Sequence, residues 1–208
     1  MPTSHPCRSC QWIENPAEVV GSVLPVGKRS KWRVNHYQSS EAILGWLVLQ
    51  PVEHKWTLDE LSDETLDDLG SALGSVQRAM QRVWTATFPD DLLERIHTTS
   101  FMESEFDEYK SPPASTFFFH IHIFLIPRSQ RLGKVIRREL TTALGVKQYV
   151  PWDDYQIFHR IKNRDASDLS EKNVPWDDLQ KYINPHGEAG KQTWKDKIEK
   201  FMNQLREQ

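Results

Sequence analysis

Several features that would point to a secreted, membrane-spanning or nucleic-acid-coating protein are missing from the sequence. Only two of the 208 residues are cysteines, Cys7 and Cys10, so a network of several disulfides is excluded. No stretch approaches the roughly 18 apolar residues of a membrane span, and the N-terminus lacks the apolar run of a signal peptide. The formal charge of −3 gives no overall basic surface, so nucleic acid is not the expected partner. We therefore expect a cytoplasmic protein, outside the membrane, that binds small ligands.

The distribution of apolar residues indicates one domain followed by an extension. Residues 1–145 carry the strand and helix patterns, with the cysteine-containing segment at their N-terminus, and we expect them to form the domain. In residues 146–208 apolar side chains are sparse and charged ones dense, which predicts a helical extension rather than a second full domain. Its last part, Gln192–Gln208, has the apolar spacing of an amphipathic helix.

Three segments in the first half of the chain have the composition of β-strands. Lys31–Tyr37 alternates apolar and polar side chains, and Ile43–Gln50 is a nearly continuous apolar run that suits a central strand stopped by Pro51. The third segment is Leu93–Phe101. The stretch from Gln11 to Lys28 is broken by prolines and glycines, which predicts an irregular surface segment.

A helix is predicted between the second and the third of these strands. Thr57 with Glu60, and then Ser62, have the spacing of N-terminal caps. Apolar residues then recur at steps of three and four from Leu66 to Val83, which is the stripe of an amphipathic helix. Such a helix would cover the sheet.

The most strand-like stretch is Thr116–Arg128, which reads TFFFHIHIFLIPR and is filled with aromatic and β-branched residues. Side chains alternate along a strand, so Ile123 faces the core while His120, His122 and Phe124 share the other face. Two histidines that project together from a buried strand are unusual unless a metal or a reaction uses them. The alternative is that both are core histidines whose ring nitrogens bond backbone carbonyls.

Cys7, Cys10, His54 and His120 supply the ligands for a zinc ion. Two thiolates and two imidazoles match the ligand types and the tetrahedral count of a structural zinc site. The C-x-x-C spacing is a weak signal by itself, and the histidine of PVEH would by itself be read as a surface residue. Together the four ligands would pin the N-terminal segment to two strand ends and hold the first histidine of the strand beside an unligated His122.

These motifs, in this order, resemble the histidine-triad superfamily of nucleotide hydrolases and transferases. The similarity covers roughly Cys7 to Arg128: PVEH follows a GWLVLQ strand, a capped amphipathic helix comes next, and HIHIFLIPR closes the series. The chain is similar to the zinc-bearing branch, which includes bacterial histidine-triad hydrolases and proteins of the galactose-1-phosphate uridylyltransferase type. The resemblance implies an α+β fold, an antiparallel β-sheet flanked by helices, with structural zinc on the four ligands.

The resemblance also implies roles for single residues. His122 has the place of the family's nucleotidylated histidine, and Asn35 falls near its ribose-contacting position. Phe124 stands where hydrolases of the family have a third histidine and transferases usually have glutamine, so one hydrogen-bond donor to a phosphate is missing. We expect Phe124 to line the substrate pocket, and we expect Ser115, Thr116 or Lys110 from the preceding loop to replace the donor.

The predicted function is that of a nucleotide hydrolase or nucleotidyltransferase. His122 would attack the α-phosphorus of a nucleoside phosphoanhydride or phosphoramidate, for example a dinucleoside polyphosphate, and the nucleotidyl-histidine would pass the nucleotide to water or phosphate. The alternative is a non-catalytic, zinc-stabilised nucleotide-binding protein in which Phe124 marks lost chemistry. A third hypothesis, the processing of nucleic-acid ends, would use the basic stretch Arg128–Arg138. Members of the superfamily are often dimers, so a homodimer is compatible with the resemblance.

Overall fold

The computed structural model describes residues 7–38, 43–55, 57–100, 121–132, 182 and 188–208. Their centre is a five-stranded antiparallel sheet in the order β1-β2-β3-β5-β4. The strands are β1 (Leu24–Val26), β2 (Trp32–His36), β3 (Leu47–Pro51), β4 (Leu93–Thr99) and β5 (Ile123–Ser129). The helices are α1 (Arg8–Glu14), α2 (Asp63–Thr87) and α7 (Glu188–Arg206), with 3-10 helices η1 (Pro16–Glu18) and η2 (Leu58–Glu60). The expected α+β fold, an antiparallel sheet flanked by helices, is confirmed.

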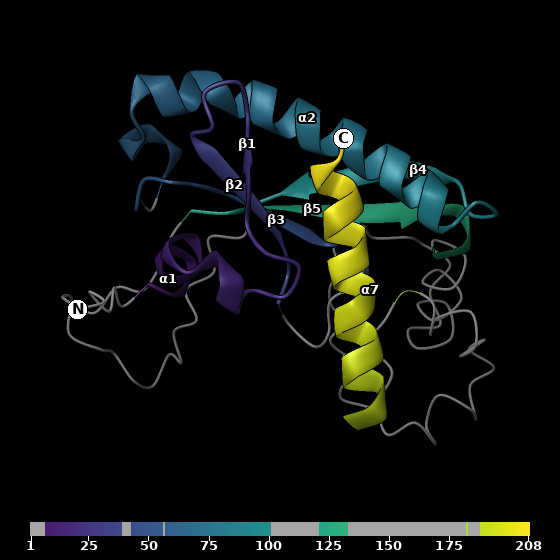
Figure 1. Ribbon diagram of the computed structural model, residues 1–208. Helices are drawn as coiled ribbons and strands as arrows, with labels where there is room; N and C mark the ends of the chain where they lie inside the picture. The colour runs from purple at the N-terminus through teal and green to yellow at the C-terminus, as the bar shows by residue number, and fades with distance from the viewer. Residues whose placement is uncertain (1–6, 39–42, 56, 101–120, 133–181, 183–187) are drawn as a thin grey trace, which may run out of the picture.

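Helices α2 and α7 cover one face of the sheet, and α1 lies well away from α2 (Figure 1). Because side chains alternate along a strand, this core face receives every second residue of the central strands: Trp32, Val34, Leu47, Leu49, Ile123 and Leu125. The predicted position of Ile123 in the core is confirmed. Its neighbour Phe124 therefore belongs to the second face of the sheet.

The C-terminal helix α7 is part of the same core. Its buried side chains include Trp194, Ile198, Phe201 and Met202, and they pack in one cluster with residues of the sheet and of α2. The predicted terminal amphipathic helix is confirmed, and it begins at Glu188 rather than at Gln192. Residues 133–181 lie outside the described part of the chain, so the predicted division at residue 145 stays a prediction.

Two segments differ from the prediction. The stretch from Gln11 to Lys28, expected to be irregular, contains most of α1, then η1, and the three residues of β1, which pair with β2. Three residues are too few to show an alternating pattern, so only the pairing with β2 defines this segment as a strand.

The central strand begins at Leu47 and not at Ile43, because Gly45 turns the chain at a φ of +83°, which glycine adopts without a Cβ clash. The N–H of Trp46 bonds back to the carbonyl of Ile43 at 3.0 Å.

Both predicted caps before α2 are confirmed. The side chain of Ser62 accepts a hydrogen bond from the N–H of Thr65 at the first turn of the helix. Thr57 and Glu60 form a capping box around η2. Satisfying these otherwise unpaired N–H groups fixes where the helix starts, and a lost cap of this kind typically costs about 1 kcal/mol.

A buried carboxylate on α2 closes the turn between β1 and β2. Asp68 accepts hydrogen bonds from the backbone N–H groups of Arg29 and Lys31, each at 3.0 Å. Gly27 permits this approach, since its φ is +88° and a Cβ there would lie 2.3 Å from an Asp68 oxygen. The leucine pattern of the helix did not predict a buried aspartate at this position. The turn compensates for its burial with charge-assisted hydrogen bonds.

A second buried carboxylate, Asp91, ties the end of β5 to the turn between α2 and β4. It accepts hydrogen bonds from the hydroxyl of Ser129 at 2.5 Å, from the N–H of Arg131 at 2.9 Å and from the hydroxyl of Tyr182. Burial, followed by the hydrogen bond to Asp91, raises the pKa of Tyr182. Tyr182 is therefore a neutral donor to Asp91 in the turn before β4.

His36, at the end of β2, is wholly buried and structural. Its Nδ1–H donates to the carbonyl of Tyr37 at 2.8 Å, and its Nε2 accepts from the N–H of Gly45 at 3.2 Å, which requires a neutral ring. The ring edge meets Trp194 of α7 at a centroid distance of 6.2 Å. Burial lowers the pKa of His36 to about 4, against the opposing effect of nearby backbone carbonyls.

We expect the free energy of unfolding to fall as the pH drops from about 6.5 toward 4. His36 has a pKa of about 4 when folded and about 6.5 when unfolded, so the unfolded chain binds more protons in this window. The loss is at most about 1.4 kcal/mol per pH unit, and the contribution is complete above the unfolded pKa. Urea unfolding across this pH range measures the slope.

His36→Gln keeps an acceptor for Gly45 but does not titrate, so its curve should be flatter than that of the wild type. His97→Gln, on the edge strand β4, is the matched control for the loss of a histidine from the sheet. An unchanged slope in His36→Gln would show that the buried ring does not cause the pH dependence.

Candidate metal centre and the histidine strand

The two cysteines lie at the first turn of α1. Cys7 is the N-cap residue, and its carbonyl accepts the N–H of Gln11 at 3.1 Å. Residues three apart on a helix share a side, so the C-x-x-C spacing at a helix start directs both thiols the same way. Cys7 is completely buried and Cys10 nearly so.

His54 approaches the cysteines from the segment after β3. Its Nδ1 lies 3.2 Å from Sγ of Cys10, and the ligand atoms of Cys7, Cys10 and His54 all lie within 4.8 Å of one another. Tetrahedral zinc with bonds of about 2.0 to 2.3 Å would separate its ligand atoms by about 3.3 to 3.8 Å. The three side chains therefore fit around one metal ion.

The electrostatics of the thiol pair favour a cation. Burial, and then the adjacent Cys7, raise the pKa of the Cys10 thiol to about 12. A metal ion between the two sulfurs would supply the positive charge that stabilises both thiolates.

Glu53 fixes the loop that carries His54. Its carboxylate accepts hydrogen bonds from the N–H of Ser62 at 3.2 Å, from the Ser62 hydroxyl at 2.5 Å and from the hydroxyl of Thr65. These hydrogen bonds lower the pKa of Glu53, and the start of a helix favours negative charge. The sequence analysis missed this positioning residue, whose signal was an acidic side chain a few residues before a serine cap.

The backbone just before β5 lies beside the segment that carries His54. The N–H of Ile121 donates to the carbonyl of Lys55 at 2.8 Å, so the residue after His120 is bonded to the residue after His54. The described residues thus bring three of the four predicted ligands together. The following predicted site residues lie outside the described part of the chain, and their roles stay predictions: His120, Lys110, Ser115 and Thr116.

Strand β5 begins at Ile123, so His122, which was predicted to lie within the strand, directly precedes it. Its ring neighbours that of Phe124, as predicted, with ring centroids 4.7 Å apart. Phe124 also meets the rings of Tyr37 at 5.4 Å and Trp46 at 5.9 Å. The phenylalanine is thus a buried member of an aromatic cluster that stabilises by packing. His122 is half-buried, and its carbonyl accepts the hydroxyl of Ser100 at 2.8 Å.

Asn35 and Gln50 form a buried polar pair on this second face. The strand register places Asn35 opposite Val48 and Val48 opposite Phe124. Nδ2 of Asn35 donates to the carbonyl of His36 at 2.8 Å. On the other side of the same amide, Oδ1 of Asn35 accepts from Nε2 of Gln50 at 3.3 Å. This order of hydrogen bonds fixes the orientation of both amides. Within the described part of the chain, Oε1 of Gln50 has no hydrogen-bond partner.

A buried acceptor without a partner costs about 1 to 3 kcal/mol, which makes Gln50 a candidate contact for a ligand. The sequence analysis did not select it, because the only signal was one polar residue at the end of an apolar run. An acceptor suits an O–H or N–H group of a ligand and does not suit an ionised phosphate oxygen.

Comparisons of the chain with known proteins did not identify a relative. The chain matches neither a protein-family model nor a curated protein sequence. Membership of the histidine-triad superfamily therefore stays a prediction from motif order. Among the residues described, no helix has both the length and the apolar character needed to cross a membrane.

Proposed function

We propose that the protein is a zinc-stabilised nucleotide hydrolase or nucleotidyltransferase that works through His122. The main support is the convergence of Cys7, Cys10 and His54, the last two of which are 44 positions apart in the chain. Two sulfurs and an imidazole form a donor set that selects zinc over calcium or magnesium. The bond between Ile121 and Lys55 supports His120 as the fourth ligand.

Zinc in this site would be structural. Four protein ligands leave no open position for a substrate. The ion would instead join α1, the segment after β3 and the start of the histidine strand. That connection would hold the backbone immediately before His122 in place.

In the proposed reaction, a ring nitrogen of His122 attacks the α-phosphorus of the substrate. The phosphorus–nitrogen bond forms, the bond to the leaving group breaks, and the leaving group takes the bonding electrons. Water or phosphate then attacks the same phosphorus and releases the histidine. The second ring nitrogen must keep its proton throughout, so that the attacking nitrogen carries a lone pair.

The polar pair on the second face would contact the sugar of the nucleotide once the side chains that cover it move, because Asn35 and Gln50 are completely buried. Oε1 of Gln50 accepts but cannot donate, so a ribose hydroxyl is a suitable partner. Asn35 lies beside it and is held by hydrogen bonds on both sides of its amide. Both side chains would therefore be oriented before the substrate arrives.

Mass spectrometry of the intact protein tests this proposal directly. We expect incubation with one member of a panel of dinucleoside polyphosphates and nucleotide sugars to add the mass of one nucleotide. The added mass would also identify the base. If every panel member leaves the mass unchanged while turnover is measured, the covalent mechanism is wrong.

The alternative is a non-catalytic nucleotide-binding protein, and the packing of Phe124 favours it. The ring packs against both Tyr37 and Trp46 and supplies no donor at the third position of the triad. Loss of one donor to a developing negative charge typically costs about 100-fold or more in rate. Nucleotide binding with neither turnover nor a trapped intermediate would support this second function.

Phe124→His and Phe124→Gln should raise kcat/KM by less than about 10-fold, the effect of about 1.4 kcal/mol of transition-state stabilisation. We expect little gain because Ser115, Thr116 or Lys110 is predicted to supply the donor. Both variants should also unfold more easily, by about 2 to 4 kcal/mol, since a polar group replaces a ring in the aromatic cluster. Steady-state kinetics with His122→Ala as the blank measure the first effect. A gain of 10-fold or more would mean that nothing replaces the missing donor.

A further inference from the structure

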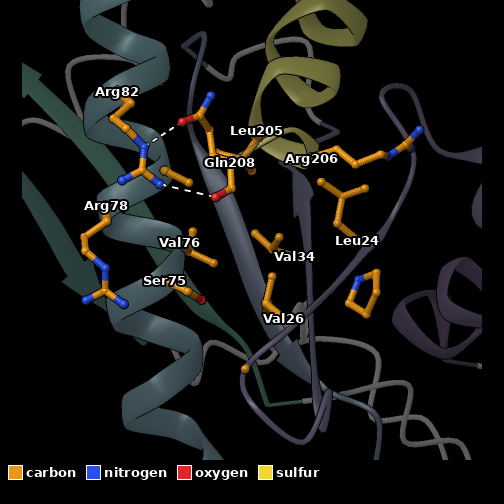
Figure 2. A pocket seen from close by; sticks show the side chains of 13 residues that line it. Leu24, Val26, Val34, Ser75, Val76, Arg78, Arg82, Leu205, Arg206 and Gln208 are labelled. Carbon is orange, nitrogen blue, oxygen red and sulfur yellow. Dashed lines mark hydrogen bonds between the residues drawn. The ribbon is translucent and has the colours of Figure 1, made fainter.

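A separate pocket lies on the helix-covered side of the sheet, whereas the ring of His122 packs against Phe124 of the opposite face. It has a volume of about 600 Å³ and lies between β1, β2, α2 and the end of α7 (Figure 2). This volume is within the range of small-molecule sites. Apolar side chains make up most of its lining: Leu24, Val26, Val34, Val76, Ala79 and Leu205.

Three arginines are among the residues that line this pocket, Arg78 and Arg82 from α2 and Arg206 from α7. All three are exposed. In the described ranges, the ion pairs between side chains do not involve any of them. A chain with a formal charge of −3 thus presents a local excess of positive charge around an apolar hollow.

Arg82 already holds two oxygen atoms with one edge of its guanidinium group. Its Nε donates to Oε1 of Gln208 at 2.6 Å, and an Nη donates to the backbone oxygen of Gln208 at 3.5 Å (Figure 2). Two N–H groups directed at two oxygens are the arrangement with which arginine binds a carboxylate. The oxygens of Gln208 therefore occupy the place that the two oxygens of a carboxylate ligand would take.

We propose that this pocket binds an aliphatic carboxylate, with its chain on the apolar floor and its head group on Arg82 in place of Gln208. Gln208 is exposed, so displacing it breaks only hydrogen bonds that compete with water, and these contribute little. A nucleotide fits less well, because the lining includes no aromatic ring on which a base could stack. This inference is independent of the function proposed for His122.

Calorimetric titration with dodecanoate, below the concentration at which it forms micelles, tests the site. Arg82→Gln should weaken binding by about 10-fold or more. Gln208→Ala removes the side-chain oxygen Oε1 that competes for Arg82, although the backbone oxygen remains, and should tighten binding. Ser75→Leu places a larger side chain in the pocket and should abolish binding. Arg95→Gln, an exposed arginine on β4, is the matched control and should bind dodecanoate like the wild type.

Dodecanol and dodecyltrimethylammonium, which share the chain but lack the carboxylate, should bind much more weakly. Equal binding of either compound, or equal weakening by Arg82→Gln and Arg95→Gln, would overturn the proposal. Tighter binding of dodecyl phosphate would overturn the assignment of a carboxylate. A wild type that sediments as a dimer, together with a monomeric Ser75→Leu, would show that a second copy of the chain fills the pocket. If Arg82→Gln does not fold, the affinity of Gln208→Ala for dodecanoate is the deciding measurement. An affinity equal to that of the wild type would also overturn the proposal.

Discussion

Cys7→Ser, purified without added zinc, should lose the metal and melt about 10 °C or more below the wild type. Structural zinc contributes on the order of 10 kcal/mol to folding in small domains, and less where a separate hydrophobic core exists. A loss of about 3 to 5 kcal/mol corresponds to such a shift for a chain of this size. Elemental analysis and thermal unfolding measure the two effects.

The substitution is informative because serine is a good residue for this backbone position. Cys7 is the N-cap of α1, and its side chain makes no capping hydrogen bond, whereas serine is a preferred N-cap. A fall in stability would therefore not come from the helix start. Cys7 is completely buried, so burial of the serine hydroxyl also lowers stability, and the loss of zinc in the same sample identifies the lost ligand. Ser9→Ala, between the two cysteines, is the matched control and should keep its zinc. Full metal content in Cys7→Ser would show that the proposed site is wrong.

His122→Ala should lower kcat/KM by about 10⁴-fold or more and should eliminate the trapped nucleotide. Removal of a covalent nucleophile generally has an effect of this size. The melting temperature should change little, because the His122 side chain is half-buried and is not among the proposed metal ligands. Single-turnover kinetics and thermal unfolding of the same preparation separate the two quantities.

His120→Ala is the informative companion variant, because it should lose zinc and stability while the neighbouring nucleophile remains. His97→Ala, on β4, controls for the loss of a histidine from the sheet. Equal falls in melting temperature for His120→Ala and His122→Ala would mean that His122 is structural. Activity that survives in His122→Ala would exclude the nucleotidyl-histidine.

The sequence predicted those elements whose stability depends on local signals. The caps at Thr57 and Ser62, and the spacing of apolar residues from Leu66 to Val83, define α2 within the chain itself. β1 has only three residues and exists because β2 pairs with it. The start of the central strand was predicted too early, because an apolar run does not reveal the left-handed turn at Gly45.

The residues of the candidate site also differ in how far the sequence alone predicts them. Cys7, Cys10 and His54 could be selected from the sequence because thiolates and imidazoles have few other uses in combination. Glu53 and Gln50 could not be selected from the sequence. Their place in the site depends on hydrogen-bond partners that are distant in the chain, and the sequence does not show which residues these are. Gln50, for example, meets Asn35, which is 15 positions away, and the hydrogen bond itself is what orients its amide.

The position of α7 also has a consequence for the synthesis of the protein. Trp194, Phe201 and Met202 complete the cluster that covers the core face of the sheet, yet a ribosome makes them after every strand of the described sheet. A nascent chain that has not reached Glu188 would expose the apolar side chains of β2 and β3 to water and to chaperones. Chains released early would carry the same exposed surface, so proteases and chaperones would recognise them as unfinished.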